Sequence, residues 1–208
     1  MKTLVFIFCL AMLQAVYAES TDEDEGWAAF QRGDYTAALK AWLPYAENGD
    51  PGTQGNIAYL YSSGLGVPQD FGEALKWNLR AAEQGYHSAQ HAVGQAYATG
   101  EGVPQDYYEA ANWHLKAALQ GYASSQFNLG IYYFEGMGVK QDIVQSYMWF
   151  DLAIVGYEQK IAEGFDMGAY RQDSLKARNM VREIMTVKQI EEARQLVREW
   201  RPKPMFTY

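Results

Sequence analysis

A loop of seven residues recurs three times in this chain at intervals of 36 residues. Each copy holds two glycines separated by one residue, then valine, glutamine and aspartate, and the copies run over residues 64–70, 100–106 and 136–142. A fixed period of this length is typical of proteins built from stacked structural repeats. The chain is therefore expected to form a row of similar units, each stacked on the next.

Each loop is followed by the signals of a helix. The closing aspartate precedes Glu73, Glu109 or Gln145 by three residues, which is the spacing of a capping box. We expect the aspartate to accept hydrogen bonds from free backbone amides and the later side chain to reach back to it. Apolar residues then recur every three or four positions until a glycine at position 85, 121 or 156, which is expected to end the helix.

A second helix is expected between each of these glycines and the next loop. Its aligned positions hold glutamine, a large aliphatic residue and then a small residue, at Ala58, Gly94 and Gly130. Glycine inside a helix costs about 1 kcal/mol relative to alanine, so a neighbouring helix must approach closely there. Every repeat is thus a pair of antiparallel helices. Three tryptophans recur at the same period and are the expected neighbours: Trp77, Trp113 and Trp149.

Residues 82–106 show the aligned glycines, tyrosine, alanines and aspartate most completely, and this pattern resembles the Sel-one-like repeat family, relatives of the tetratricopeptide repeats. The resemblance covers about residues 50–155. It implies an all-α protein, an α/α solenoid in which antiparallel helix hairpins with a 36-residue period form a right-handed superhelix with helical caps. Such solenoids bind proteins or peptides on a concave surface made by the first helix of each pair.

The ends of the chain depart from the repeat. The N-terminal part lacks the glycine loop, as terminal repeats often do. The repeat fails after Gly156, where two further helices are expected to begin near Ser174 and at Thr186. The expected organisation is a signal peptide at 1–18, N-terminal capping helices at 19–49, three helix pairs at 50–157, a C-terminal helical cap at 158–202 and a tail at 203–208.

The first 18 residues have the pattern of a cleaved secretory signal peptide. Lys2 gives a positive start, an apolar stretch runs from Leu4 to Leu13, and small residues precede the expected cleavage after Ala18. An uncleaved membrane anchor is the alternative, but a span needs about 20 apolar residues. Cys9 is the only cysteine. The mature chain is therefore expected to be a soluble protein of the periplasm or the extracellular space, held together without disulfides.

The charge distribution argues against nucleic acid as a partner. Residues 19–170 carry 20 acidic and seven basic side chains, whereas residues 171–208 carry five acidic and nine basic ones. Nucleic-acid binding depends on the neutralisation of phosphates. The basic C-terminal part either contacts an acidic partner or an anionic lipid, or forms a helix with a solvated face of mixed charge.

Catalytic, cofactor and metal sites are not expected. The loop glycines lack the lysine and the serine or threonine of a phosphate-binding loop, and Asp106 and Glu109 are assigned to helix capping. His87 and His91 are four residues apart but have no third metal ligand in register. These two histidines are therefore expected to face solvent, and His114 to face outward or to cap the packing.

Partner-binding residues are expected at aligned positions of the repeats where the residue type differs from one repeat to the next, while the residues that build the helix pairs stay the same. On the first helices these positions are three and four residues apart, so they share one face. The candidate partner-binding residues are Tyr59, His91, Gln95, Phe127, Ile131 and Phe134. The last three form the most apolar set, which is either a partner site or is covered by the C-terminal helices or by the tail with Phe206 and Tyr208.

Three functions remain open. The first is a non-catalytic scaffold, exported to the bacterial periplasm or beyond the cell, that binds a protein or peptide in envelope assembly, secretion or host contact. The second is a cell-wall-related enzyme or a binder of peptidoglycan or of a β-lactam, by analogy with cysteine-rich family members whose cysteines are absent here. The third is a membrane-associated assembly factor that uses the basic C-terminal part.

Overall fold

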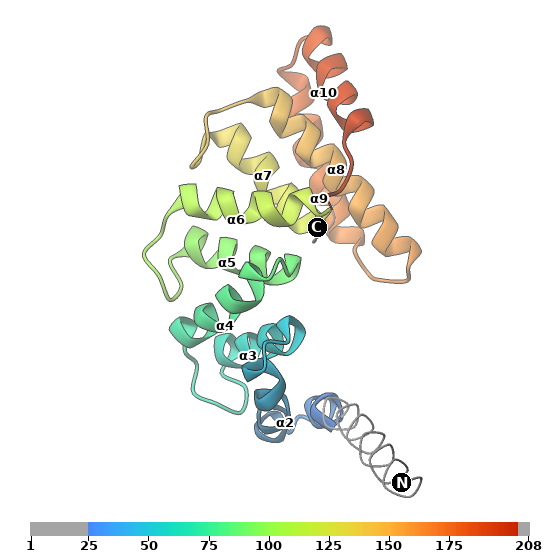
Figure 1. The fold of residues 1–208 in the computed structure, drawn as a ribbon. Coiled ribbons are helices and arrows are strands. Elements are labelled where there is room, and N and C mark those ends of the chain that lie inside the picture. The colour runs from blue at the N-terminus through green and yellow to red at the C-terminus, as the bar shows by residue number, and fades with distance from the viewer. Residues whose placement is uncertain (1–24, 204–208) are drawn as a thin grey trace, which may run out of the picture. The chain divides into compact units, whose positions relative to one another are not determined.

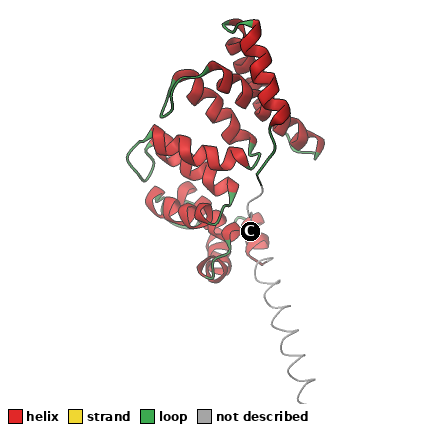
Figure 2. Cartoon of the chain, turned by 45° about the horizontal axis from the view of Figure 1, so that its top comes forward, coloured by secondary structure: helices red, strands yellow, loops and turns green. Residues whose placement is uncertain are grey.

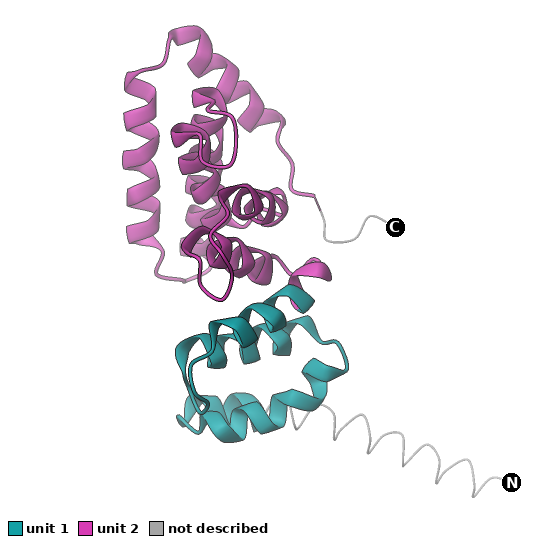
Figure 3. Cartoon of the chain, turned by 90° about the vertical axis from the view of Figure 1, so that its left-hand side faces the viewer, with its two compact units in different colours: residues 1–80 teal, residues 81–208 magenta. Residues whose placement is uncertain are grey.

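The computed structural model of the protein describes residues 25–203. Within these residues all regular secondary structure is helical (Figure 2), which confirms the all-α solenoid class expected from the repeat. The expected signal peptide and residues 204–208 lie outside the described residues. The chain divides into two compact units, residues 1–80 and 81–208 (Figure 3), and each unit is described by itself.

The helices follow the repeat closely (Figure 1). A helix over residues 25–31 opens the described chain, and the expected pairs are formed by α3 with α4, α5 with α6, and α7 with α8. The remaining bounds are α2 (Tyr35–Glu47), α3 (Pro51–Ser63), α4 (Phe71–Glu83), α5 (His87–Thr99), α6 (Tyr107–Leu119), α7 (Ala123–Glu135), α8 (Ile143–Ala162), α9 (Gly168–Glu183) and α10 (Val187–Glu199).

Buried glutamines hold the start of each first helix to the end of the helix before it. Nε2 of Gln54 donates to the carbonyl oxygen of Ala46 at 2.9 Å, and Nε2 of Gln126 donates to that of Ala118 at 3.2 Å. Gln90 makes the equivalent bond at 3.1 Å. These carbonyls lie in the last turn of a helix, where intrahelical donors run out. The glutamine column is therefore explained by capping of helix ends.

The two glycines of each loop have different structural roles: the first ends a helix and the second contacts a neighbouring helix. Gly136 ends α7 in the left-handed conformation, with φ 75°. Gly138, with φ 66°, lies against the backbone of Tyr107 at the start of α6, where a β-carbon would overlap the peptide group. Gly66 lies against the backbone of Tyr35 at the start of α2 in the same way. The loop thus docks on the second helix of the preceding pair, and only glycine permits both the turn and the contact.

The closing aspartates cap the next helix as expected, but the return half of the capping box is not formed at the loops. Oδ1 of Asp106 accepts from the backbone N–H of Glu109 at 3.2 Å. The N–H of Asp106 donates to the carbonyl oxygen of Tyr97 at 2.9 Å, so it is already occupied. The complete reciprocal box occurs at Thr186 and Gln189, as the sequence predicted.

The small residues of the first helices allow a ring to approach, but not the predicted ring. A β-carbon on Gly94 would lie 2.8 Å from Cε1 of His114, and one on Gly130 would lie 2.5 Å from Cε1 of Phe150. The contacting side chain is one residue after the tryptophan, which turns it by about 100° around the helix. The prediction that the tryptophans themselves make this contact is wrong for Trp113 and Trp149.

The first unit opens with a shortened repeat. Gly26 lies against the indole of Trp42, which repeats the contact of glycine with a ring on the second helix. Trp42 packs with Ala38, Ile57 and Leu60 in a buried core that joins α2 to α3. The N-terminal capping role assigned to this region therefore uses the same helix contact as the repeats, without the glycine loop before it.

The second unit ends differently from the prediction. Helix α8 runs through Gly156 to Ala162, so the expected helix end at Gly156 is wrong, and the boundary drawn after residue 157 falls inside α8. A β-carbon on Gly156 would lie 2.9 Å from Cβ of Ala123, so this glycine lets α8 pass close to the start of α7. Helix α9 begins at Gly168, six residues before the predicted start near Ser174.

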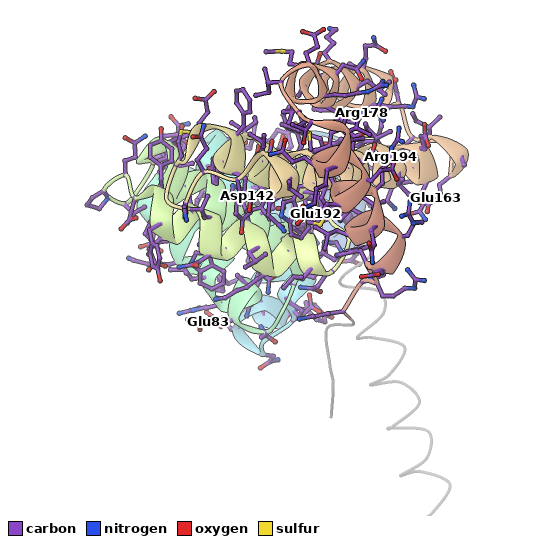
Figure 4. All side chains as sticks on the ribbon, turned by 90° about the horizontal axis from the view of Figure 1, so that it is seen from above. Glu83, Asp142, Glu163, Arg178, Glu192 and Arg194 are labelled. Carbon is purple, nitrogen blue, oxygen red and sulfur yellow. The ribbon has the colours of Figure 1, made fainter. Side chains whose placement is uncertain are left out.

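Helices α9 and α10 both pack on α8 (Figure 1). Arg178 lies on α9 (Figure 4). It donates to Asp151 of α8 at 2.7 Å, and this half-buried ion pair fixes the two helices to each other. Trp200, just after α10, packs in the cluster that holds Leu119 at the end of α6. Among the helices of residues 25–203, none combines the length and apolar character needed to cross a membrane.

Candidate functional site

A continuous series of hydrogen-bonded side chains joins α5, α6 and α7 in the second unit. Oε1 of Gln95 accepts from Nδ2 of Asn128 at 3.0 Å, and the same nitrogen lies 3.2 Å from Nε2 of His114. Nδ1 of His114 lies 3.2 Å from Oγ of Ser125, which lies 2.9 Å from Nδ1 of His91. We call these five residues the polar chain.

The bonds of the polar chain favour one tautomer of each histidine. Asn128 donates to Nε2 of His114, so that nitrogen carries no proton and Nδ1 carries it instead. His114 therefore donates to Ser125, and the serine hydroxyl donates onward to Nδ1 of His91. The remaining proton of His91 lies on Nε2. Each buried polar group thus has a partner, as buried groups require.

The polar chain is buried in its middle and reaches the surface at both ends. His114 and Ser125 are completely buried, Asn128 and His91 are half-buried, and Gln95 is exposed. The prediction that His91 faces solvent is therefore wrong, and so is an outward direction for His114. The physical reason is the missing side chain at Gly94, which admits the imidazole of His114 between the helices.

His87, which was also expected to face solvent, is half-buried instead. Its ring stacks on Tyr122 with the centroids 5.1 Å apart. His91 also lies 5.1 Å from Tyr122. No group of three His, Cys, Asp or Glu side chains placed to hold a metal ion gathers in the part of the chain that the structure describes.

Burial keeps the polar chain uncharged at neutral pH. It lowers the pKa of His91 to about 4. It lowers the pKa of His114 to about 3, with a smaller effect from the neighbouring His91. Removing a charged imidazole from water is costly, so the neutral form is favoured. At pH 7 the site therefore offers hydrogen bonds and no net charge.

A serine between two imidazoles is also the beginning of a nucleophilic site, but its surroundings do not suit that chemistry. Ser125 is completely buried, so its hydroxyl is closed to a substrate in this structure. A general base works best with a pKa near the operating pH, and the pKa values of His91 and His114 are lowered to about 4 and about 3. The polar chain is therefore suited to holding side chains in place.

Two amide side chains present the accessible end of the polar chain. Oε1 of Gln95 and Nδ2 of Asn128 bind each other. The Nε2 group of Gln95 and Oδ1 of Asn128 have no partner within residues 25–203 and are left as one donor and one acceptor, from neighbouring helices. A main-chain peptide group offers the complementary acceptor and donor. We call Gln95 and Asn128 the amide pair.

The apolar candidates are brought together, but the C-terminal helices cover them. Phe127, Ile131 and Phe134 are half-buried and pack in one cluster with Phe150 of α8 and Val181 of α9. This is the first of the two coverings considered from the sequence, and the tail residues Phe206 and Tyr208 lie outside the described residues. A cavity of about 160 Å³ remains between α7 and α9.

Tyr59, the candidate in the first unit, lies on the surface of α3. It is 52% exposed. Its ring centroid is 6.1 Å from that of Phe30 in the opening helix. Tyr59 is thus an accessible aromatic side chain beside the aromatic core of the first unit, whereas His91 and Gln95 belong to the polar chain of the second.

The basic C-terminal part forms helices with mixed charge. Lys176 lies 3.1 Å from Asp173 on α9, and Arg194 lies 3.1 Å from Glu191 on α10. These exposed pairs, three residues apart, are of the kind that contributes little to stability. They favour the solvated-face interpretation of this region.

Comparison with known proteins agrees with the fold. The Sel1 repeat model matches residues 53–86, 87–122 and 123–154. No curated protein matches the chain. Among solved structures, the chain is similar to a Sel1 repeat protein from Oxalobacter formigenes, with 25% identity and a TM-score of 0.62 over 84% of this chain and 74% of that one.

A second solved structure is that of a protective antigen present in uropathogenic Escherichia coli strains, described as displaying an SLR fold. The identity is 33% and the TM-score 0.66, over 79% of this chain. This chain spans only 32% of that protein's length. The family match, the solved structures and the observed helix pairs agree that residues 53–154 are three Sel1 repeats and that the chain belongs to the Sel1 repeat family.

Proposed function

We propose that this protein is an exported, non-catalytic scaffold that binds an extended segment of a partner protein across α5 and α7. Sel1 repeats are consistent with a role in protein interaction. In solenoids of this kind the first helices of successive repeats line the binding surface. Helices α5 and α7 are two successive first helices of the second unit.

The amide pair is the observation that carries this proposal. Gln95 and Asn128 lie on successive first helices and bind each other at 3.0 Å. Their remaining donor and acceptor match a peptide group of an extended chain, which would bind by its backbone. Asn128 is held from behind by His114 at 3.2 Å. A side chain fixed before binding loses less entropy when the partner arrives.

The absence of charge at the site supports recognition of a backbone rather than of charged side chains. Because the pKa values of His91 and His114 are lowered to about 4 and about 3, the polar chain is neutral at pH 7. A neutral site gains little from long-range attraction, so its binding should change little with salt. Specificity then comes from the side chains that flank the bound backbone, including His91 through its Nε2–H group.

Export is proposed from the N-terminal sequence and is supported by analogy. Residues 1–18 have the positive start, apolar stretch and cleavage pattern of a signal peptide. The similar Escherichia coli protein is a protective antigen, which fits a protein encountered outside the cytoplasm. Mass spectrometry of the protein recovered from its cells checks this point: a chain that begins at Glu19 is expected, and a chain that retains residues 1–18 would contradict it.

Partner capture by point variants tests the binding proposal. The double variant Gln95→Ala, Asn128→Ala is expected to lose at least tenfold in affinity for the partner that the unsubstituted protein captures. The matched control is Gln105→Ala, an exposed glutamine of the loop after α5 whose Nε2 donates to Ala98. Equal loss in both variants, or full binding by the double variant, would place the binding site elsewhere.

A further inference from the structure

A cavity of about 300 Å³ lies in the second unit where α7 begins. It is lined by His87 at the start of α5, by residues 120–124, by the last turns of α8 and by Met167 just before α9. The cavity exists because α8 continues past Gly156 as far as the residue before Glu163 (Figure 4), which places its last turns beside the start of α7.

The walls of the cavity include three rings, those of His87, Tyr122 and Tyr157, and one charged side chain, Lys160. The ring of His87 stacks on Tyr122 with an interplanar angle of 28°. Burial, with a smaller effect from the charge of Lys160, lowers the pKa of His87, so this ring is neutral at pH 7. The hydroxyl of Tyr157 donates to Ser124 at 3.3 Å. Such walls suit an aromatic or thioether side chain.

One polar atom in these walls lacks a partner. Nδ1 of His87 is buried and makes no hydrogen bond with any described residue. Buried polar atoms are usually paired, and an unpaired one requires an explanation. The cavity volume is at the lower end of the range for ligand sites. An occupant with one or two large side chains would fill the space.

The described chain ends beside the same cavity. The backbone N–H of Lys203 donates to the carbonyl oxygen of Leu119 at 2.7 Å. Cβ of Pro202 lies 3.9 Å from the place of a β-carbon on Gly121, and Gly121 is itself part of the cavity wall. Packing of Trp200 against the cluster that holds Leu119 fixes this exit point.

The next five residues carry three large side chains: Met205, Phe206 and Tyr208. Five extended residues reach at most about 17 Å. Because the segment is attached beside the cavity, its effective concentration there is in the millimolar range without any further contact. A weak apolar contact is then sufficient for occupancy.

We propose that residues 204–208 bind in this cavity, with the side chain of Phe206 against the rings of Tyr122 and Tyr157. This inference does not depend on the proposed partner site. It has a consequence for that site: His87 is one helical turn before His91 on α5, and Ser124 is one turn before Asn128 on α7. The bound segment therefore borders the polar chain.

Disulfide trapping in the full-length protein tests the proposal. The background is Cys9→Ser, which leaves the chain without cysteine. Phe206→Cys is combined with Gln159→Cys in the cavity wall, or with Lys116→Cys as the control, an exposed residue of α6 three residues before Leu119. The cavity pair is expected to oxidise at least tenfold faster. Equal rates, or faster trapping at position 116, would overturn the proposal.

A peptide experiment tests occupancy without cysteines. A fluorescent peptide of residues 203–208 is added to the unsubstituted protein and to the full-length variant Met205→Ser, Phe206→Ser, Tyr208→Ser. The peptide is expected to bind the variant at least tenfold more tightly, because the attached segment competes only in the unsubstituted protein. NMR spectra of the variant with the peptide locate the binding site, and chemical-shift changes are expected at Gly121. Equal binding to the two proteins or binding to neither would show that the cavity is not the site of this segment. Chemical-shift changes at Met180 instead of Gly121 would show the same.

Discussion

The imidazole of His114 lies in the space that a side chain at position 94 would occupy. A β-carbon on Gly94 would be 2.8 Å from Cε1 of the ring, closer than such contacts normally are. This single relationship joins the repeat to the candidate site, because the ring admitted by the glycine holds Asn128 with one nitrogen and Ser125 with the other.

Replacement of Gly94 by leucine should therefore destabilise the protein. The new side chain would enter the space of His114 and push α5 from α6, and overpacking of this kind costs about 1–3 kcal/mol or more. Lys188→Leu, which places the same side chain at an exposed position of α10, should change the free energy of unfolding by less than about 0.5 kcal/mol. Urea denaturation measures both, and equal midpoints would contradict close packing at residue 94.

The glycine column was predictable from the sequence, but the ring that faces it was not. A repeated small residue in mid-helix shows only that something approaches closely. The residue that approaches changes from His114 to Phe150 between repeats, whereas the repeated tryptophans attract attention without making the contact. The repeated residues predict how the helices are arranged, whereas the residue that varies between repeats determines which side chain contacts the glycine.

The end of the repeat was mispredicted for a related reason. A glycine that follows a helical pattern commonly ends the helix, and Gly85 and Gly121 have positive φ angles of 89° and 92°. Gly156 occupies the same column but lies inside α8, because it serves a close approach to Ala123. The sequence at this position is compatible with both roles, and tertiary packing decides between them.

The candidate face was predicted in part. His91 and Gln95 were named from the columns that differ, and both belong to the polar chain. The sequence analysis did not name Asn128 or Ser125. Asn128 could have been found from the columns that differ between repeats, because the aligned residue one repeat earlier is Ala92. Phe127 and its apolar neighbours are covered by α9. The sequence of α9 does not follow the repeat, so the repeat pattern could not predict this packing.

The loop glycines test whether each loop docks on the second helix of the preceding pair. Gly138→Ala should cost more than Gly164→Ala, although both residues have positive φ angles, of 66° and 95°. Alanine in that conformation costs about 1–2 kcal/mol at either position. At Gly138 the new carbon also overlaps the backbone of Tyr107, whereas at Gly164 nothing lies within 4 Å. Thermal denaturation separates the two, and equal losses would show that the loop does not dock on α6.

The buried glutamines can be tested against the exposed ones. Gln126→Leu should lower the free energy of unfolding by about 1 kcal/mol, because it removes a buried hydrogen bond to the carbonyl of Ala118, which keeps the N–H of Gly121 as a donor at 2.9 Å. Gln141 donates to Phe134 at 2.6 Å, but it lies on the surface, where water can replace it. Gln141→Leu should therefore cost less than Gln126→Leu. A larger loss at position 141, measured by urea titration, would refute the capping explanation.

The buried histidines predict a dependence of stability on pH. The pKa of His114 is lowered from 6.5 to about 3 in the folded protein, so the unfolded chain takes up protons first as the pH falls. The stabilising contribution of the neutral ring is complete above pH 6.5 and is lost progressively as the pH falls to about 3.

His114→Phe removes that titration and imitates Phe150, which faces Gly130 in the next repeat. Between pH 7 and pH 4 the variant is expected to lose about 2–4 kcal/mol less stability than the unsubstituted protein. Guanidinium denaturation at the two pH values provides the comparison, and groups common to both proteins cancel. Parallel losses in the two proteins would mean that His114 is already charged in the folded state.

The central claim is that a partner binds across the amide pair, and site-specific photo-crosslinking in living cells tests it most directly. A photoreactive residue at position 95 is compared with one at position 116, on the exposed side of α6. The account predicts that position 95 captures one defined protein, that position 116 does not, and that Asn128→Ala reduces the capture at least tenfold. Capture of the same protein from position 116 but not from position 95 would contradict it.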